Sequence, residues 1–367
     1  MGNIKSVYNM KNAYCVIMAG GIGSRFWPLS KTQKPKQFLD ILGTGRTLIQ
    51  QTFDRFHKLM PSENIYVVSN KIYKDIILEQ LPELTEEQVL LEPAMRNTAP
   101  CIAYATYKIL SKDPDANFVV APSDHLILKE DEFIRNISDG LKFTEESGNL
   151  LTLGIKPSRP ETGYGYIQIK VNEEGSDSIF NEVKTFTEKP DLELAKVFLE
   201  SGDFYWNSGI FLWKGNTILN AFNKYLTDVA QKFAEGESLY YTPKEQAFIE
   251  EAYPSCKNIS IDYGIMEKAD NVYVLCADFG WSDLGTWGSL YDQLPKDDDA
   301  NASNKKVFMY DSKNNLINVP EDKIVVLQGL EDFIVVESDD TLLICKMSEE
   351  QRIKHFVNDV KLELGTD

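Results

Sequence analysis

The sequence predicts an α/β protein with a mixed, mostly parallel sheet, followed by a small β domain and a terminal helix. Two patterns support this. Apolar strand-like runs alternate with helical patterns in the first half, and short strand-like runs follow a polar segment near residue 300. Such alternation favours βαβ units with helices on both faces of a sheet. The 367 residues suggest about two domains, at roughly 150 residues each.

The first half contains three pairs of an apolar run and an amphipathic pattern: 14–18 with 48–59, 65–69 with 72–81, and 118–121 with 133–144. A further helix is expected after Asn97, with Thr98 available as its cap and with Ala103, Tyr107 and Leu110 on one face. Runs 163–171 and 183–186 resemble antiparallel strands, so we expect the sheet to be mixed.

A polar segment from Lys296 to Lys306 lacks apolar periodicity and predicts a boundary between a catalytic domain, 1–295, and a C-terminal domain, 296–367. Five short strands are expected in the second domain, at 307–310, 316–319, 324–327, 333–336 and 342–345. The segment 348–351 predicts a capping box that opens a final helix. The apolar face of that helix would contain Ile353, Phe356, Val357, Val360 and Leu364.

The composition limits the classes of function. The net charge is −18, which argues against nucleic acid as a partner, and no apolar run approaches a membrane span. Five scattered cysteines without CxxC spacing indicate reduced thiols, and we expect a cytoplasmic protein. Residues 1–6 fit the myristoylation pattern, but a ragged start before Met10 explains them equally well.

The segment 18–38, MAGGIGSRFWPLSKTQKPKQF, is the most informative part of the chain. It places Gly20, Gly21 and Gly23 after a predicted strand, where a backbone can approach a ligand closely. Arg25, Lys31, Lys34 and Lys36 follow without an intervening acidic residue, as a triphosphate requires. By itself, GGIGSR fits two interpretations equally well. One is a phosphate-binding loop, and the other is a plain turn with a solvated basic face. Neither a dinucleotide-binding fingerprint nor a Walker A loop is complete.

The whole string GGIGSRFWPLS with KPKQF resembles the signature of the sugar-nucleotide pyrophosphorylases, which join a nucleoside triphosphate to a sugar 1-phosphate. FWPLS and PKQFL resemble the branch that forms GDP-mannose, and six motifs in family order cover about 14–295. The resemblance implies a Rossmann-like, glycosyltransferase-A-like nucleotidyltransferase domain and a short left-handed β-helix. It also implies GTP and α-D-mannose 1-phosphate as substrates, with Mg²⁺ as the cofactor.

Two aspartates stand out for the metal. Asp124 in APSDH follows a predicted strand, and Asp283 in GWSDLGTW precedes a predicted helix. Each could simply cap a turn or a helix; the resemblance implies that both hold Mg²⁺. The resemblance also implies catalytic roles for Arg25, Lys36 and Lys189. The expected nucleotide-binding residues are Gly20, Gly21, Gly23, Ser24, Arg25, Lys36, Asn97, Thr98 and Ser123.

The acceptor side is expected in FTEKP at 186–190 and in YWNSGIFLW at 205–213. Glu188 and Lys189 could form an ordinary exposed ion pair. The resemblance implies instead that Lys189 holds the sugar phosphate and that Glu188 accepts from sugar hydroxyls. Asn207 and Gly165 complete the predicted sugar-phosphate site. Asp262 and Glu267 resemble a further family motif, DYGIMEK, to which no role is assigned.

Two other functions stay open at this point. One is a pyrophosphorylase that uses glucose 1-phosphate with UTP or dTTP, which the FWPLS, KPKQF, RNTAP and WNSGIF segments disfavour. The other is a non-catalytic sugar-nucleotide sensor on the same fold, which would not need to keep a pair of metal ligands. Because the short C-terminal strands have exposed edges, we also expect a homodimer.

Overall fold

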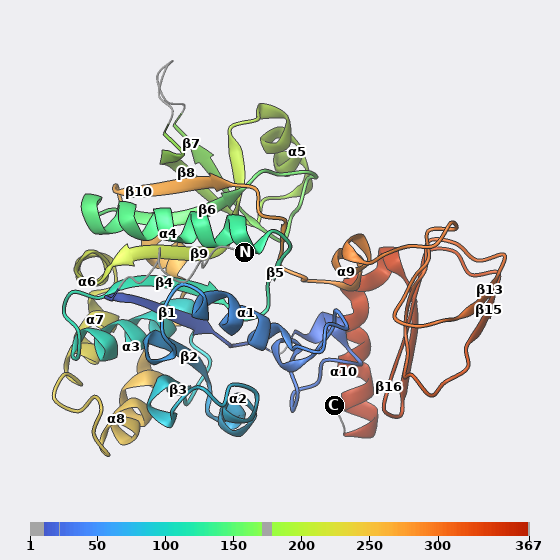
Figure 1. Ribbon diagram of the computed structural model, residues 1–367, viewed down its shortest axis with the longest axis horizontal. Helices are drawn as coiled ribbons and strands as arrows, with labels where there is room; N and C mark the ends of the chain where they lie inside the picture. Colours follow the sequence, from blue (N-terminus) through green and yellow to red (C-terminus); the bar gives the residue numbers. More distant parts are fainter. Residues whose placement is uncertain (1–10, 22, 171–177, 366–367) are drawn as a thin grey trace, which may run out of the picture. The chain divides into compact units, whose positions relative to one another are not determined.

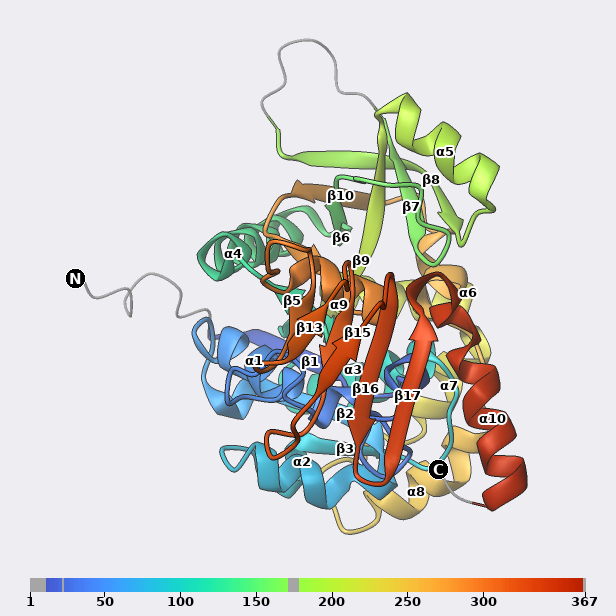
Figure 2. The same cartoon turned by 90° about the vertical axis from the view of Figure 1, so that its right-hand side faces the viewer.

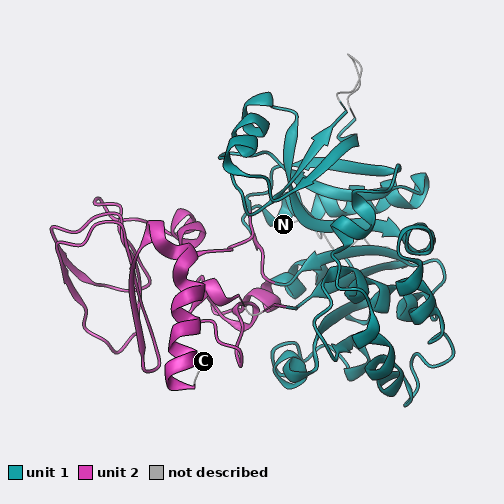
Figure 3. Cartoon of the chain, turned by 180° about the vertical axis from the view of Figure 1, so that it is seen from behind, with its two compact units in different colours: residues 1–20, 52–123, 127–281 teal, residues 21–51, 124–126, 282–367 magenta. Residues whose placement is uncertain are grey.

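The computed structural model describes residues 11–21, 23–170 and 178–365, so the pattern at residues 1–6 lies outside the described part. The chain forms two compact units (Figure 3). Unit 1 contains residues 1–20, 52–123 and 127–281, and unit 2 contains residues 21–51, 124–126 and 282–367. These units follow spatial contacts rather than continuous segments, and the predicted division at residue 295 stays a prediction.

A nine-stranded sheet forms the centre of unit 1, in the order β3-β2-β1-β4-β9-β6-β10-β8-β7, with β7 also paired to β9. Among the described residues, seven of these strands share one direction, while β8 and β9 run opposite. The expected mixed, mostly parallel sheet is thus confirmed. The strands are β1 (Ala13–Met18), β2 (Ile65–Asn70), β3 (Val89–Glu92), β4 (Asn117–Pro122), β6 (Leu150–Ile155), β7 (Gly165–Ile169), β8 (Phe180–Glu188), β9 (Phe204–Lys214) and β10 (Val272–Ala277).

Helices cover both faces of this sheet, because its central strands are apolar on both sides. Tyr14 and Val16 of β1 belong to a large core cluster with α3, α6 and α7, while Cys15 and Ile17 are buried on the other face. That other face is covered by α4, which runs along the strands (Figure 1) and approaches β6 and β9 closely at Gly140. The helices are α1 (Leu48–His57), α2 (Lys74–Gln80), α3 (Thr98–Leu110), α4 (Glu130–Ser147), α5 (Leu192–Ser201), α6 (Gly215–Tyr225), α7 (Thr227–Ala234) and α8 (Glu245–Ala252).

The start of α3 differs from the prediction. Asn97, rather than Thr98, is the N-cap, and its side chain accepts a hydrogen bond from the Thr98 amide. Asn97 has a φ of 66° and a ψ of −171°, a strained backbone conformation that residues other than glycine rarely adopt. The Thr98 hydroxyl is therefore available to accept from the Ile261 amide, at 2.9 Å.

Two chain segments leave the sheet side by side at the carboxyl end of its parallel strands. The register pairs Met18 of β1 with Pro122 of β4, and the Ser123 amide donates to the Met18 carbonyl at 3.0 Å. Ligands of open α/β sheets bind at this end of the strands. The glycine-rich segment after β1 and Asp124 after β4 thus begin at neighbouring positions.

Unit 2 joins the loop after β1 to the C-terminal strands and helix. Phe26 and Trp27 share a core cluster with Trp287, Ile334 and Ile353. Figure 2 shows β16 and β17 next to α10, which contributes to the same cluster. The elements are β12 (Ala302–Ser303), β13 (Phe308–Tyr310), β14 (Leu316–Asn318), β15 (Val326–Gln328), β16 (Phe333–Ser338), β17 (Thr341–Lys346), α9 (Trp287–Gln293) and α10 (Ile353–Leu364); β5 (Leu126–Ile127) and β11 (Trp281–Ser282) lie where the chain passes between the units.

The capping box predicted at 348–351 is wrong. Ser348 and Gln351 lie inside a 3₁₀ helix, Met347–Arg352, which precedes α10 and has Lys346 as its N-cap, without a side-chain cap hydrogen bond. Between them, the Glu350 carboxylate accepts from the Gly288 amide. The predicted apolar face is mostly confirmed, since Ile353 and Val357 are buried. Leu364 lies outside it, with 70% of its surface exposed. No helix in the described part of the chain is long and apolar enough to cross a membrane.

Candidate active site

Lys36 lies at the centre of a charged cluster in unit 2. It begins the 3₁₀ helix Lys36–Phe38, and its side chain is almost fully buried. Its ammonium lies 2.8 Å from Asp124 Oδ2, and it donates to the carbonyls of Asp283 and Leu284 at 2.8 and 2.9 Å. The structure thus brings together the predicted cation and both predicted metal-binding residues, which are far apart in the sequence.

The cluster keeps the Asp124 carboxylate ionised. Burial by itself would raise the pKa of Asp124, but the Lys36 ammonium, helped by His125, holds that pKa below its ordinary value. An ionised carboxylate of this kind can bind a divalent cation. The partner of Asp124 is a buried ammonium, which a simple turn cap would not require.

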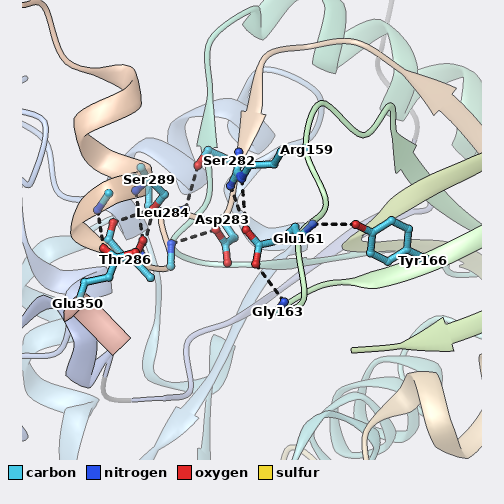
Figure 4. A network of polar contacts seen from close by, with 12 residues as sticks. Arg159, Glu161, Gly163, Tyr166, Ser282, Asp283, Leu284, Thr286, Ser289 and Glu350 are labelled. Carbon is cyan, nitrogen blue, oxygen red and sulfur yellow. Dashed lines mark hydrogen bonds and ion pairs between the residues drawn. The ribbon is translucent and has the colours of Figure 1, made fainter. Parts of the chain in front are cut away.

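Asp283 occupies a tight turn before α9 (Figure 4). Its Oδ1 accepts from the Gly285 amide at 2.9 Å, while Thr286 and Ser289 form the capping box of α9. Asp283 is therefore not the N-cap that its position before a helix would suggest. The described residues contain no group of three or more His, Cys, Asp or Glu side chains suited to a metal. Two carboxylates nevertheless fit Mg²⁺, which keeps several waters and usually takes one or two carboxylates.

The glycine-rich loop explains how Lys36 can reach this position. Gly21 and Gly23 have φ values of 91° and 64°. A Cβ on Gly23 would lie 2.7 Å from the Lys36 Cβ, so any larger residue would displace Lys36. Ser24 and Arg25 follow directly in the 3₁₀ helix Ser24–Phe26, and the buried Nε of Arg25 has no hydrogen-bond partner among the described residues. A buried donor without a protein partner is available to donate to a ligand oxygen.

Unit 1 holds the remaining predicted nucleotide-binding residues. Gly20 follows β1, and Ser123 is buried at the end of β4, where its carbonyl accepts from Thr52. The segment with Asn97 and Thr98 is fixed by Arg96, whose Nε and Nη2 both donate to the Pro254 carbonyl. These contacts order the backbone of the segment that contains Asn97 and Thr98, whose predicted role in nucleotide binding stays a prediction.

The acceptor residues of unit 1 come together on β7, β8 and β9. Gly165 of β7 pairs with Glu188 of β8, and a Cβ on Gly165 would lie 2.3 Å from Glu188 Oε2. Lys189 has a φ of 50°, and its exposed ammonium lies 3.2 Å from Glu188 Oε1. The glycine thus makes room for the carboxylate, and the strained backbone of Lys189 marks the end of β8.

Asp262, to which the sequence assigned no role, contacts the predicted site residue Asn207. It opens a π-helix, Asp262–Met266, and its carboxylate accepts from the Asn207 amide at 2.7 Å. Burial, followed by the nearby Glu188 charge, raises the pKa of Asp262 to about 6. Burial and the same Glu188 charge also raise the pKa of Glu267. π-Helical turns occur frequently at functional sites, and the DYGIMEK motif was the signal that could have identified this one.

The loop before β7 is held by its own hydrogen bonds (Figure 4). The Glu161 carboxylate accepts from Arg159 and from the Gly163 amide, and the Glu161 amide donates to the Tyr166 hydroxyl. These bonds order the turn that leads into Gly165.

Comparison with known proteins identifies the class. The profile described as "Nucleotidyl transferase" matches residues 14–300, and a profile described as "MannoseP isomerase/GMP-like beta-helix domain" matches residues 305–360. The chain belongs to the nucleotidyl transferase family and is a nucleotidyltransferase with a C-terminal β-helix-like domain. This confirms the predicted fold class. Members of the family generally use a divalent metal ion.

Relatives indicate the particular branch. The chain is 38% identical over 354 residues to a mannose-1-phosphate guanylyltransferase of Salmonella montevideo, and the match covers 95% of this chain and 74% of that protein. It is 35% identical over 353 residues to the enzyme of the same name from Escherichia coli, covering 95% and 75%. A crystal structure from Thermus thermophilus, described as a mannose-1-phosphate geranyltransferase, has a TM-score of 0.86 at 26% identity and covers 95% of this chain and 99% of that one.

Proposed function

We propose that this chain transfers GMP from GTP to α-D-mannose 1-phosphate, giving GDP-mannose and pyrophosphate. The observation that carries the proposal is the cluster in which Lys36 contacts Asp124 and the backbone of Asp283. A phosphate oxygen of the sugar attacks the α-phosphorus in line, and pyrophosphate leaves. Such a reaction needs positioning and charge neutralisation rather than covalent catalysis by the protein.

Residues of unit 2 would act on the triphosphate. The Arg25 guanidinium is a planar fork suited to the departing pyrophosphate, and Lys36 provides a compact charge near the α-phosphate. Gly21, Gly23 and Ser24 would contribute backbone and hydroxyl donors. The resemblance assigns Gly20, Asn97, Thr98 and Ser123, which belong to unit 1, to nucleotide binding as well. Phosphate oxygens are already nucleophilic, so the mechanism requires no general base.

Asp124 and Asp283 would hold Mg²⁺. When bound, this ion neutralises charge on the phosphates and orients them. The ionised state of Asp124 and the ordered turn at Asp283 support this assignment, because both carboxylates are hard oxygen donors held in place before a cation arrives.

Residues of unit 1 would bind the acceptor. Lys189 would hold the sugar phosphate, while Glu188 and Asn207 would bind sugar hydroxyls. Asn207 is oriented by Asp262, since its amide nitrogen donates to that carboxylate and its Oδ1 accepts from Thr152 at 3.2 Å. Gly165 leaves the space that Glu188 occupies. Asp262 thus acts as a positioning residue for Asn207 in this proposal.

The test is a matrix of substrates. The purified protein is incubated with Mg²⁺, each of GTP, UTP and dTTP, and each of mannose 1-phosphate and glucose 1-phosphate, and pyrophosphate release is measured. Release only with GTP and mannose 1-phosphate supports the proposal. Preference for UTP or dTTP with glucose 1-phosphate would identify the other pyrophosphorylase, and no release from any pair would favour the sensor.

We also propose that the protein is a cytoplasmic homodimer. Its five cysteines are free thiols, as expected in a reducing compartment. The C-terminal strands expose Phe308, Tyr310, Val326 and Ile344, all of them at least 47% exposed. Apolar strand surfaces of this kind favour pairing with a second copy. Light scattering should show a dimer that Phe308→Ser with Val326→Ser weakens; a monomeric wild-type protein would contradict this part.

A further inference from the structure

A basic pocket lies within unit 2, between the segment 24–32 and the C-terminal helix α10. Its volume is about 280 Å³. Ser24, Trp27, Ser30, Lys31 and Thr32 line it from the loop, and Lys354, Val357, Asn358 and Lys361 line it from the helix. The sequence predicted only an apolar face for this helix, and polar side chains of α10 beside the segment 24–32 were not among the predicted site residues.

The lining has the chemistry of an anion site. Its polar side chains are three lysines, three hydroxyls and one amide, and none of the described lining residues is acidic. This is unexpected in a chain with a net charge of −18. Hydroxyl, amide and ammonium donors gathered around one space are the groups that bind phosphate oxygens.

The helix is anchored so that these lysines stay at the loop. Ile353 and Val357 are buried in the core cluster that also contains Phe26 and Trp27. Residues 354, 357, 358 and 361 are spaced three and four apart, so they share one face of α10. Lys31, across the pocket, is held by an ion pair with Asp339 at 2.8 Å. The walls of the pocket are therefore held in place by the core packing of α10 and by the ion pair of Lys31.

The pocket lysine Lys354 has no ion pair within the described residues. The positive charge of Arg25, ahead of burial, lowers the pKa of Lys354. The buried Arg25 Nε lacks a hydrogen-bond partner in the same described set. Like charges held near each other are unfavourable unless an anion joins them.

We propose that this pocket binds a pyrophosphate group, with Lys354 and Lys361 of α10 and Ser24 of the signature loop as donors. The inference rests on the proposed function for its biological role, because that reaction both uses a triphosphate and releases pyrophosphate. The group could reach the pocket as the β- and γ-phosphates of GTP, or as free pyrophosphate. Either way, the C-terminal helix contributes binding residues to the enzyme.

The direct test is a calorimetric titration of the full chain with inorganic pyrophosphate, with no nucleotide or sugar present. Lys354→Gln should weaken binding about tenfold, and the double variant with Lys361→Gln should weaken it further. The matched control is Lys346→Gln, which removes an equal charge from an exposed position outside the pocket. If both pocket variants bound pyrophosphate as the wild type and the control do, the inference would be overturned.

Steady-state kinetics separate the two sources. If the pocket holds the β- and γ-phosphates of GTP, Lys354→Gln raises the KM for GTP and, by a similar factor, the KM for pyrophosphate in the reverse reaction. The KM for mannose 1-phosphate stays unchanged. If it takes free pyrophosphate, only inhibition by added pyrophosphate weakens. The titration does not depend on turnover. A chain that failed to transfer GMP but bound pyrophosphate through Lys354 would refute the proposed function and retain this inference.

Discussion

The candidate site residues of the two units differ in how their carboxyl groups are surrounded by charge. In unit 2, a buried ammonium lies against Asp124 and lowers the pKa of that carboxyl. In unit 1, Glu188 lies near Asp262 and Glu267, and the pKa of each of the latter two is raised. The first arrangement suits phosphates and a metal ion, which need fixed charges. The second suits hydroxyl groups, because grouped carboxylates offer several acceptor oxygens to O–H donors.

The largest expected effect comes from the two carboxylates of unit 2. Asp124→Asn or Asp283→Asn should each lower kcat/KM by about 10³-fold or more at ordinary Mg²⁺ concentrations, because a metal clamp supplies several kcal/mol of transition-state stabilisation. In Asp283→Asn, the side-chain carbonyl oxygen could still accept from the Gly285 amide, so the fold should survive. Asp292→Asn, an exposed change on α9, is the control. Near-normal rates for Asp283→Asn would remove the metal assignment.

Lys36 should come next. Lys36→Met keeps most of the side-chain volume but removes the ammonium that contacts Asp124, so turnover should fall by about 10²–10³-fold and the pKa of Asp124 should rise. The matched change is Lys34→Met, on an exposed lysine of the same loop. Assays of both variants over a range of GTP concentrations test this. Equal losses in the two would mean that only the net charge of the loop matters.

A smaller and more selective effect is expected in unit 1. Gly165→Ala places a methyl group 2.3 Å from the present position of Glu188 Oε2, so the carboxylate must turn away. We expect the KM for mannose 1-phosphate to rise about tenfold while that for GTP stays within about twofold. Gly163→Ala, in the same loop, has 3.3 Å to its nearest atom and serves as the control. A change in both KM values would show that Gly165 matters for the fold instead.

The smallest effect concerns stability and pH. Because the pKa of Asp262 rises from 3.8 unfolded to about 6 folded, the folded chain binds more protons than the unfolded chain between those values. Its contribution to stability is therefore present below about pH 4 and is lost as the pH rises to about 6. Because asparagine does not ionise, Asp262→Asn should abolish this loss of stability with rising pH. The variant should gain about 1–3 kcal/mol relative to wild type between pH 4 and 7 in denaturant unfolding, and parallel curves would contradict the assignment.

The sequence predicted the fold well where local pattern and burial agree. The apolar runs beginning near Tyr14, Ile65 and Phe118 became parallel strands, and the strands at the C-terminus lie close to their expected positions. Predictions from local sequence were wrong at the starts of two helices. The predicted capping box at 348–351 did not form, because its residues lie inside a 3₁₀ helix, Met347–Arg352, that precedes α10. Glu350 accepts from the Gly288 amide, 62 residues away, and no local rule contains such a contact.

The same distinction applies to the candidate site. Motifs were sufficient to select Lys36, Asp124 and Asp283, and the structure brings these three together. They were not sufficient to assign Asp262, whose meaning depends on Asn207 on another strand. Nor could they anticipate Lys354, because only tertiary packing places α10 against the segment 24–32.

In the proposed mechanism, unit 2 acts on the triphosphate and unit 1 acts on the sugar phosphate. Steady-state kinetics of Arg25→Ala and Lys189→Ala test this division most directly. For each variant, the concentration of GTP is varied at saturating mannose 1-phosphate, and the concentration of mannose 1-phosphate is varied at saturating GTP. We expect a crossed result: Arg25→Ala raises the KM for GTP at least about tenfold more than that for mannose 1-phosphate, and Lys189→Ala does the reverse. Equal effects of either variant on both substrates would contradict the division.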